Sequence, residues 1–138
     1  MADTDEPKDQ TILVVDDEID VRALVRDVLT LHGYRVIDTG DPFEARRLVE
    51  TQTVHLLLTD VVMPIMNGVE LAKRVETASP ATKVLLMSGF STAAAKGSGR
   101  PLLTKPFKPS DLLNAVRQIL DSRAAFRRPG PPAPPPPG

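Results

Sequence analysis

Short apolar runs alternate with stretches of helical periodicity along most of this chain. The apolar runs predict five strands, within the segments TILVVDD (11–17), YRVIDT (34–39), LLLT (56–59), KVLLMS (83–88) and PLLTKP (101–106). The last of these is a poorer strand than the others. An alternation of strands and helices predicts an α/β fold in which helices cover both faces of a parallel sheet.

Helical signals occupy the segments between these strands. The first helix face is marked by apolar residues at helical spacing, namely Val21, Leu24, Val25 and Val28. Asp41 suits the N-cap of a second helix, Pro42 suits its first position, and Glu44 completes the spacing of a capping box. Further helices are predicted around residues 71–75 and from residue 109 onward.

Polar residues lie at the carboxyl ends of four of the five predicted strands. They are Asp16 and Asp17 after the first strand, Asp60 after the third, Ser88 after the fourth and Lys105 after the fifth. A single acid in such a place, such as Asp60 before the turn-forming Met-Pro and Asn-Gly pairs, is commonly a turn residue. In a parallel sheet, however, these ends share one edge, where functional crevices form. Five polar residues converging there predict a site.

The chemistry of this set points to an aspartyl phosphate. Three carboxylates in one crevice repel one another, and a hard divalent cation such as Mg²⁺ relieves the repulsion. Zinc is disfavoured because the chain has no cysteine, and because His32 and His55 are not at this edge and are interpreted as structural. With Mg²⁺ present, one carboxylate can attack phosphorus while a lysine and a hydroxyl hold the phosphoryl oxygens.

Length, charge and cysteine content set broader limits. The 138 residues suffice for one domain, and the formal net charge of −1 predicts neither nucleic-acid nor membrane binding. An acidic start without an apolar run is not a secretory signal, and no stretch is long enough to span a bilayer. We therefore expect a cytoplasmic protein.

The two ends differ in composition from the middle. Residues 1–10 are acidic and are expected to be flexible, whereas residues 122–138 hold the segment PGPPAPPPPG, which contains seven of the fourteen prolines. Such a segment favours polyproline II or disorder. It could bind an aromatic groove, although a disordered, solvated tail is the preferred interpretation. The folded domain is therefore placed at residues 11–121.

Four motifs resemble those of the receiver domains of two-component response regulators. They are VVDDE at 14–18, LLLTDVVMPIMNG at 56–68, LLMSG at 85–89 and TKPF at 104–107. The resemblance covers about residues 11–121 with the motifs in the family order. It implies a flavodoxin-like, doubly wound sheet of five parallel strands in the order 2-1-3-4-5, with five helices.

The same resemblance implies a role for each matching residue. Asp60 corresponds to the phosphoacceptor, Ser88 to the switch hydroxyl, and Lys105 to the lysine that pairs with the phosphoryl group. The residues implied to hold Mg²⁺ are Asp16, Asp17, Asp60 and Val62, the last through its backbone carbonyl. Pro106 corresponds to a proline that follows a cis peptide bond.

Two features depart from the family pattern. Leu102 occupies a position that is aromatic in many receivers, so the resemblance does not extend to signalling through an aromatic rotor. The segment between Ser88 and Lys105 is also several residues short, so the fourth helix, expected from about STAAAK (91–96), should be short or irregular.

The resemblance implies a single-domain response regulator that takes a phosphoryl group from a histidine kinase or a histidine phosphotransfer protein and acts on a downstream protein target. It is not expected to be an enzyme beyond self-catalysed phosphotransfer and autodephosphorylation. An alternative is a receiver detached from a hybrid histidine kinase. A Mg²⁺-dependent phosphatase with an aspartyl intermediate and a non-phosphorylated pseudo-receiver are disfavoured by the motifs.

Overall fold

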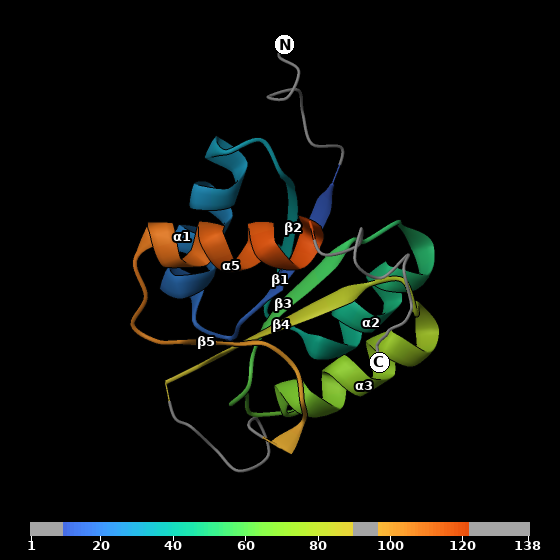
Figure 1. The fold of residues 1–138 in the computed structure, drawn as a ribbon. Coiled ribbons are helices and arrows are strands. Elements are labelled where there is room, and N and C mark those ends of the chain that lie inside the picture. Colours follow the sequence, from blue (N-terminus) through green and yellow to red (C-terminus); the bar gives the residue numbers. More distant parts are fainter. Residues whose placement is uncertain (1–9, 90–96, 122–138) are drawn as a thin grey trace, which may run out of the picture.

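Five parallel strands form one sheet in the order β2-β1-β3-β4-β5 (Figure 1). The computed structural model describes residues 10–89 and 97–121. The strands are β1 (Thr11–Val15), β2 (Arg35–Thr39), β3 (Leu56–Asp60), β4 (Lys83–Ser88) and β5 (Leu102–Thr104). The predicted strand order is confirmed, and the weakest predicted strand is the shortest.

Four helices lie in the described ranges, at the places that the apolar periodicity and the capping signals predicted. They are α1 (Ile19–Leu31), α2 (Pro42–Thr51), α3 (Gly68–Ala78) and α5 (Pro109–Asp121). The predicted fourth helix at 91–96, the tail at 122–138 and nearly all of the N-terminal segment lie outside the described residues. None of the four helices is long and apolar enough to cross a bilayer.

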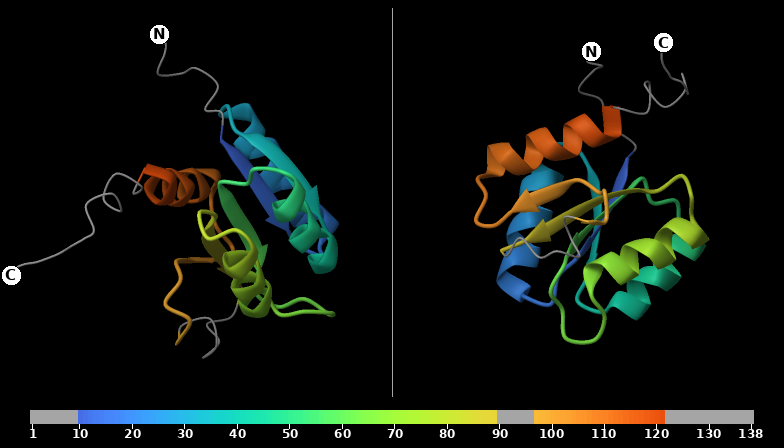
Figure 2. Two further views of the ribbon diagram at one scale, coloured as in Figure 1. Left: turned by 90° about the vertical axis from the view of Figure 1, so that its right-hand side faces the viewer. Right: turned by 60° about the horizontal axis from the view of Figure 1, so that its bottom comes forward.

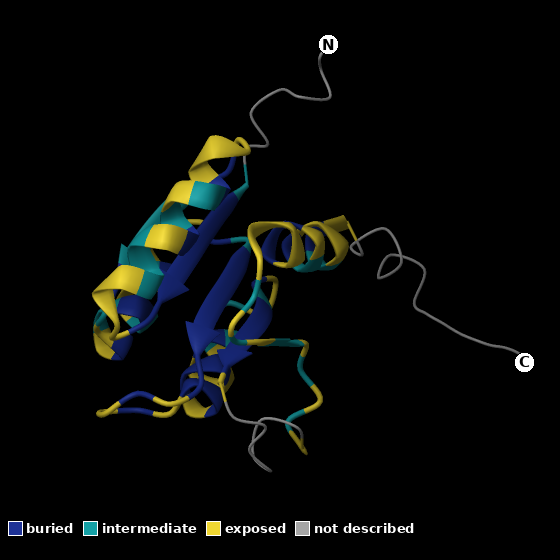
Figure 3. Cartoon of the chain, turned by 90° about the vertical axis from the view of Figure 1, so that its left-hand side faces the viewer, coloured by how far each residue is buried: buried dark blue, intermediate teal, exposed yellow. Residues whose placement is uncertain are grey.

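The sheet separates two apolar layers. Alternate residues of β1 and β3, such as Leu13 and Leu57, pack against α2 and α3, whereas their neighbours Ile12 and Leu56 pack against α1 and α5. Figure 2 shows these helix pairs on opposite faces, and Figure 3 shows buried strands between partly exposed helices. Because β1 and β3 are covered on both faces, they are continuous apolar runs rather than alternating ones.

The start of α2 differs from the predicted capping box. Asp41 is the N-cap, as predicted, and its Oδ1 accepts the Phe43 N–H at 2.9 Å. Glu44, however, accepts the Thr39 hydroxyl at 2.6 Å, and Thr39 Oγ1 accepts the Asp41 N–H at 3.1 Å. In a capping box, Glu44 itself would accept the Asp41 N–H. Here the Thr39 hydroxyl accepts that N–H and donates its own hydrogen to Glu44.

Candidate functional site

Three carboxylates meet at the carboxyl end of the two central strands. Asp16 and Asp17 follow β1, and Asp60 is the last residue of β3. Each offers an oxygen, and these oxygens lie within 4.8 Å of one another. Asp16 and Asp60 are buried, whereas Asp17 is exposed. The structure therefore brings together the three acids that the sequence predicted at one edge.

Lys105 joins this cluster from the turn after β5. Its Nζ lies 3.2 Å from Asp16 Oδ2 and 3.4 Å from Asp60 Oδ1. The Lys105–Pro106 peptide bond is cis, as the family resemblance implied. The ammonium group therefore bridges carboxylates that come from two different strands.

Ser88 reaches the same edge as the last residue of β4. Its side chain is buried, and its backbone carbonyl accepts the Lys105 N–H at 2.9 Å. The neighbouring Met87 is paired in register with Asp60 on β3. The strand pairing therefore places the predicted switch hydroxyl beside the strand ends that carry the acceptor and the lysine.

An open pocket of about 280 Å³ gives access to this edge. It is lined by Asp17, Glu18, Asp60, Val62, Gly89 and Lys105. Val62, whose carbonyl is the predicted backbone ligand, is thus found at the pocket. All the predicted site residues accordingly lie at this edge, although their chemical roles stay predictions.

The electrostatics of the site follow from burial and crowding. Burial raises the pKa of the Asp60 carboxyl, and the nearby negative charge of Asp16 raises it further, against the opposing attraction of Lys105. Burial alone would lower the pKa of the Lys105 ammonium, but the attraction of Asp16 and Asp60 outweighs it, so that this pKa is raised. Without another cation, the site makes the Asp60 carboxyl a weaker acid than an ordinary aspartate and makes the Lys105 ammonium harder to deprotonate.

The donor set fits Mg²⁺. Carboxylate and carbonyl oxygens are its usual ligands in proteins, and the ion usually keeps several waters, for which an open pocket leaves room. Lys105 alone leaves part of the repulsion among the three acids uncompensated, because, in addition to the larger effect of burial, Asp16 and Asp17 raise the pKa of Asp60. Asp16, Asp17, Asp60 and the Val62 carbonyl are therefore the residues that would hold the ion.

Sequence reasoning missed the contact made by Glu18. Its Oε1 lies 3.5 Å from Lys105 Nζ, so that an exposed acid shares the lysine with Asp16 and Asp60. The available signal was its position directly after the acid pair. The two histidines lie elsewhere, as predicted: His55 Nδ1 accepts the Thr11 N–H at 3.0 Å, and His32 Nδ1 lies 3.0 Å from the Val28 carbonyl.

The raised pKa of Asp60 leads to a prediction for the metal-free protein. A folded-state pKa above the ordinary value of 3.8 means that the folded protein binds the proton more tightly than the unfolded chain. The resulting loss of stability is absent below the unfolded pKa and becomes complete as pH rises through the folded pKa. Asp60→Asn should therefore raise the melting temperature of the metal-free protein at neutral pH by a few degrees.

Thermal unfolding with a chelator or with Mg²⁺ measures this effect. Added Mg²⁺ should raise the melting temperature of the parent by mass action and raise that of Asp60→Asn less. The stabilisation by Asp60→Asn should also shrink toward acid pH. Equal melting temperatures for the two proteins at neutral pH, together with no response of the parent to Mg²⁺, would contradict the crowding of charge described above.

Comparison with known proteins agrees with this geometry. The family model described as "Response regulator receiver domain" matches residues 12–117. The response regulator receiver protein CpdR of Brucella abortus (strain 2308) is 34% identical over 114 residues, which are 79% of this chain and 95% of CpdR.

Solved structures give the same result. The chemotaxis protein CheY4 of Vibrio cholerae matches with a TM-score of 0.74 at 30% identity, over 80% of this chain and 98% of CheY4. A CheY-like receiver domain protein from Methanospirillum hungatei JF-1 matches with a TM-score of 0.79 at 25% identity, over 85% of this chain and 98% of that one. Together with the strand order and the acid cluster, these matches show that the chain belongs to the response regulator receiver domains of two-component systems.

Proposed function

We propose that Asp60 accepts a phosphoryl group from the phosphohistidine of a histidine kinase or of a histidine phosphotransfer protein. The observation that carries the proposal is the meeting of Asp16, Asp17 and Asp60 within 4.8 Å, with the Lys105 ammonium 3.4 Å from the Asp60 carboxylate. A cluster in which one carboxylate is a nucleophile and the others can hold a divalent cation fits phosphoryl transfer.

The chain's own residues can carry out the transfer. An oxygen of the ionised Asp60 carboxylate forms a bond to phosphorus while the P–N bond of the phosphohistidine breaks, and the imidazole nitrogen keeps that electron pair. Asp16, Asp17, Asp60 and the Val62 carbonyl would hold Mg²⁺, which would supply positive charge to keep Asp60 ionised and to neutralise phosphoryl oxygens. Lys105 pairs with the transferred group, and the Ser88 hydroxyl donates a hydrogen bond to it.

The consequence of phosphorylation is a change in protein interactions. Ser88 and Lys105 make contacts with the phosphoryl group that the unmodified protein lacks, and such differential contacts can shift a conformational equilibrium. We assign no turnover of an external substrate, only self-catalysed phosphotransfer and autodephosphorylation. We propose that the downstream target is a protein and that this signalling takes place in the cytoplasm.

The chain is proposed to act as a stand-alone regulator. This is supported by the Brucella relative, which the match covers over 95% of its length and which is therefore a protein of receiver size. A receiver within a hybrid histidine kinase is the second candidate, because the same site would serve there. Rates of phosphoryl transfer to this chain from several separate histidine kinases would show whether one of these kinases is a dedicated partner.

The proposal is tested by incubating the protein with acetyl phosphate and Mg²⁺ and measuring its intact mass. We expect the mass to rise by one phosphoryl group, the adduct to be labile, and a chelator to prevent its formation. A pseudo-receiver would gain no mass. A phosphatase would release phosphate continuously from phosphomonoesters, so sustained turnover of such a substrate would contradict the assignment.

A further inference from the structure

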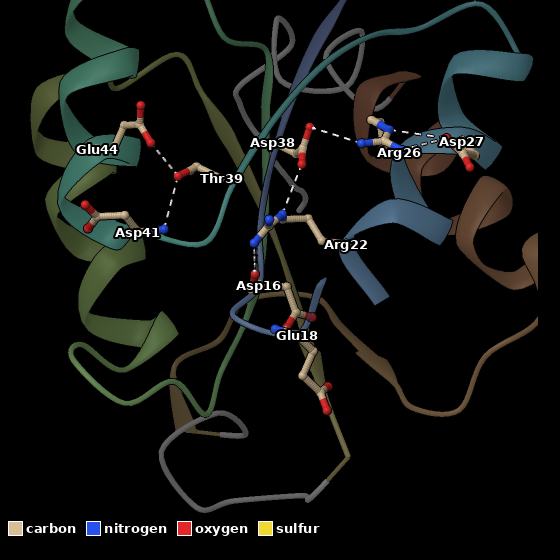
Figure 4. A network of polar contacts seen from close by, with 9 residues as sticks. All are labelled: Asp16, Glu18, Arg22, Arg26, Asp27, Asp38, Thr39, Asp41 and Glu44. Atoms are coloured by element: carbon tan, nitrogen blue, oxygen red, sulfur yellow. Dashed lines mark hydrogen bonds and ion pairs between the residues drawn. The ribbon is translucent and has the colours of Figure 1, made fainter. Parts of the chain in front are cut away.

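Arg22 connects α1 to the backbone of the acid cluster. Its Nη1 donates to the Asp16 carbonyl oxygen at 2.9 Å, while its Nε donates to Asp38 Oδ2 at 3.0 Å (Figure 4). Asp38 belongs to β2, so a single guanidinium links the first helix, the edge strand and the first acid. A planar guanidinium holds its donors in a fixed fork, which makes such a double contact directional.

Arg22 binds the carbonyl oxygen of Asp16, which is the first residue of the segment 16–18, here called the acid turn. The Asp16 N–H is held by the Thr39 carbonyl at 3.3 Å, and Asp16 Oδ1 accepts the Glu18 N–H at 2.9 Å. The Asp16 carbonyl belongs to the peptide that leads into Asp17. Its orientation therefore helps to determine where the exposed Asp17 carboxylate lies relative to Asp16 and Asp60.

Gly40 provides the space for this contact. A Cβ at Gly40 would lie 2.5 Å from Arg22 Nη1 and 3.5 Å from the Asp16 carbonyl oxygen. A side chain at position 40 would thus displace the end of the arginine. Any residue larger than glycine here would compete for the place that the guanidinium occupies against the acid turn.

Charge alone gives no reason for an arginine beside a cation site. A positive charge this near bound Mg²⁺ repels it by Coulomb's law, and the ion pair with Asp38 only reduces the repulsion. Arg26 offers a comparison, since its Nη1 lies 3.9 Å from Asp38 Oδ1 but its Nε donates to Asp27 Oδ1 instead of the Asp16 carbonyl. The two arginines therefore share a carboxylate and differ in their contact with the acid turn.

We propose that Arg22 is a positioning residue for the metal site, which fixes the Asp16–Asp17 peptide so that both carboxylates face Asp60. The inference deepens the proposed function and rests on it, because it concerns the same site. Groups that orient metal ligands from outside the ligand set typically change metal affinity by about 10–100-fold.

The test compares Mg²⁺ binding to the parent, Arg22→Met and Arg26→Met by titration calorimetry, at a temperature where all three are folded. Removing a positive charge should by itself strengthen Mg²⁺ binding, and Arg26→Met should bind equally well or slightly better. If Arg22 positions the turn, Arg22→Met should instead bind about tenfold more weakly. Unchanged or stronger binding by Arg22→Met would overturn the inference.

A second variant retains every charge. Gly40→Ala should push the guanidinium away from the Asp16 carbonyl and also weaken Mg²⁺ binding, which keeps the test decisive if Arg22→Met does not fold. A purely structural role would lower the melting temperature of these variants and leave their Mg²⁺ affinity when folded unchanged, which would refute the inference.

Amide exchange adds a readout that needs no metal. In Arg22→Met the hydrogen-bonded Asp16 and Glu18 N–H groups should exchange faster than in the parent, whereas those of β3 should be unaffected. Failure of the proposed function would look different, because the parent itself would then bind no Mg²⁺ and gain no phosphoryl group.

Discussion

The Asp60→Asn protein should gain no mass from acetyl phosphate and Mg²⁺, whereas the parent gains one phosphoryl group. The carboxamide lacks the negative charge that makes a carboxylate oxygen a nucleophile toward phosphorus. Asp16 and Asp17 remain in this variant, so the experiment separates the acceptor from the acids that hold the ion. Because Asn has nearly the same shape as Asp, the fold should persist.

Asp20→Asn is the matched control. Asp20 is an exposed acid in the first turn of α1, outside the cluster that could hold a metal. This control should be phosphorylated like the parent and lose the group at the same rate. A labile adduct of full stoichiometry on Asp60→Asn would show that another residue is the acceptor.

Gly68→Ala should be strongly destabilising, because helix α3 begins in direct contact with the backbone that carries Asp60. A Cβ at Gly68 would overlap the Asp60 carbonyl oxygen and lie 2.9 Å from Val61 Cα. Backbone atoms cannot rotate away as a side chain can, so the start of α3 must shift from the end of β3. Overpacking of this kind costs about 1–3 kcal/mol of unfolding free energy.

Urea unfolding of the metal-free protein measures this cost, and the rate of phosphorylation reports any displacement of Asp60. Gly89→Ala is the control, since Gly89 lines the same pocket and a Cβ there meets no atom of the described residues within 4 Å. The unfolding free energy of Gly89→Ala should stay within about 0.5 kcal/mol of the parent value. Equal stability of the two variants would show that α3 can relax away from β3 at little cost.

The convergence of the site residues could be predicted because it depends on topology. Once the apolar runs were interpreted as parallel strands, Asp16, Asp60 and Lys105 had to share an edge, and the structure places their charged groups within ion-pair distance. The family motifs added the acceptor assignment and the cis peptide before Pro106. Neither needed any knowledge of how side chains are oriented.

Contacts between side chains of different elements could not be predicted in this way. Arg22 reaches the Asp16 carbonyl because α1 packs at a particular rotation and Gly40 leaves space, and neither condition is visible in a spacing pattern. For the same reason Glu44 was assigned to a capping box, whereas a hydroxyl on the neighbouring strand binds it instead. Local spacing says which partners are possible, and packing selects among them.

The lysine held between two strand ends has a consequence for the order of events during phosphorylation. Lys105 cancels only one of the negative charges that Asp16, Asp17, Glu18 and Asp60 bring to the pocket, so the pocket without a metal ion repels an anion such as a phosphodonor. A divalent cation cancels two more of these charges. We therefore expect the metal ion to bind before the phosphodonor. The free Mg²⁺ concentration would then control the rate of phosphorylation.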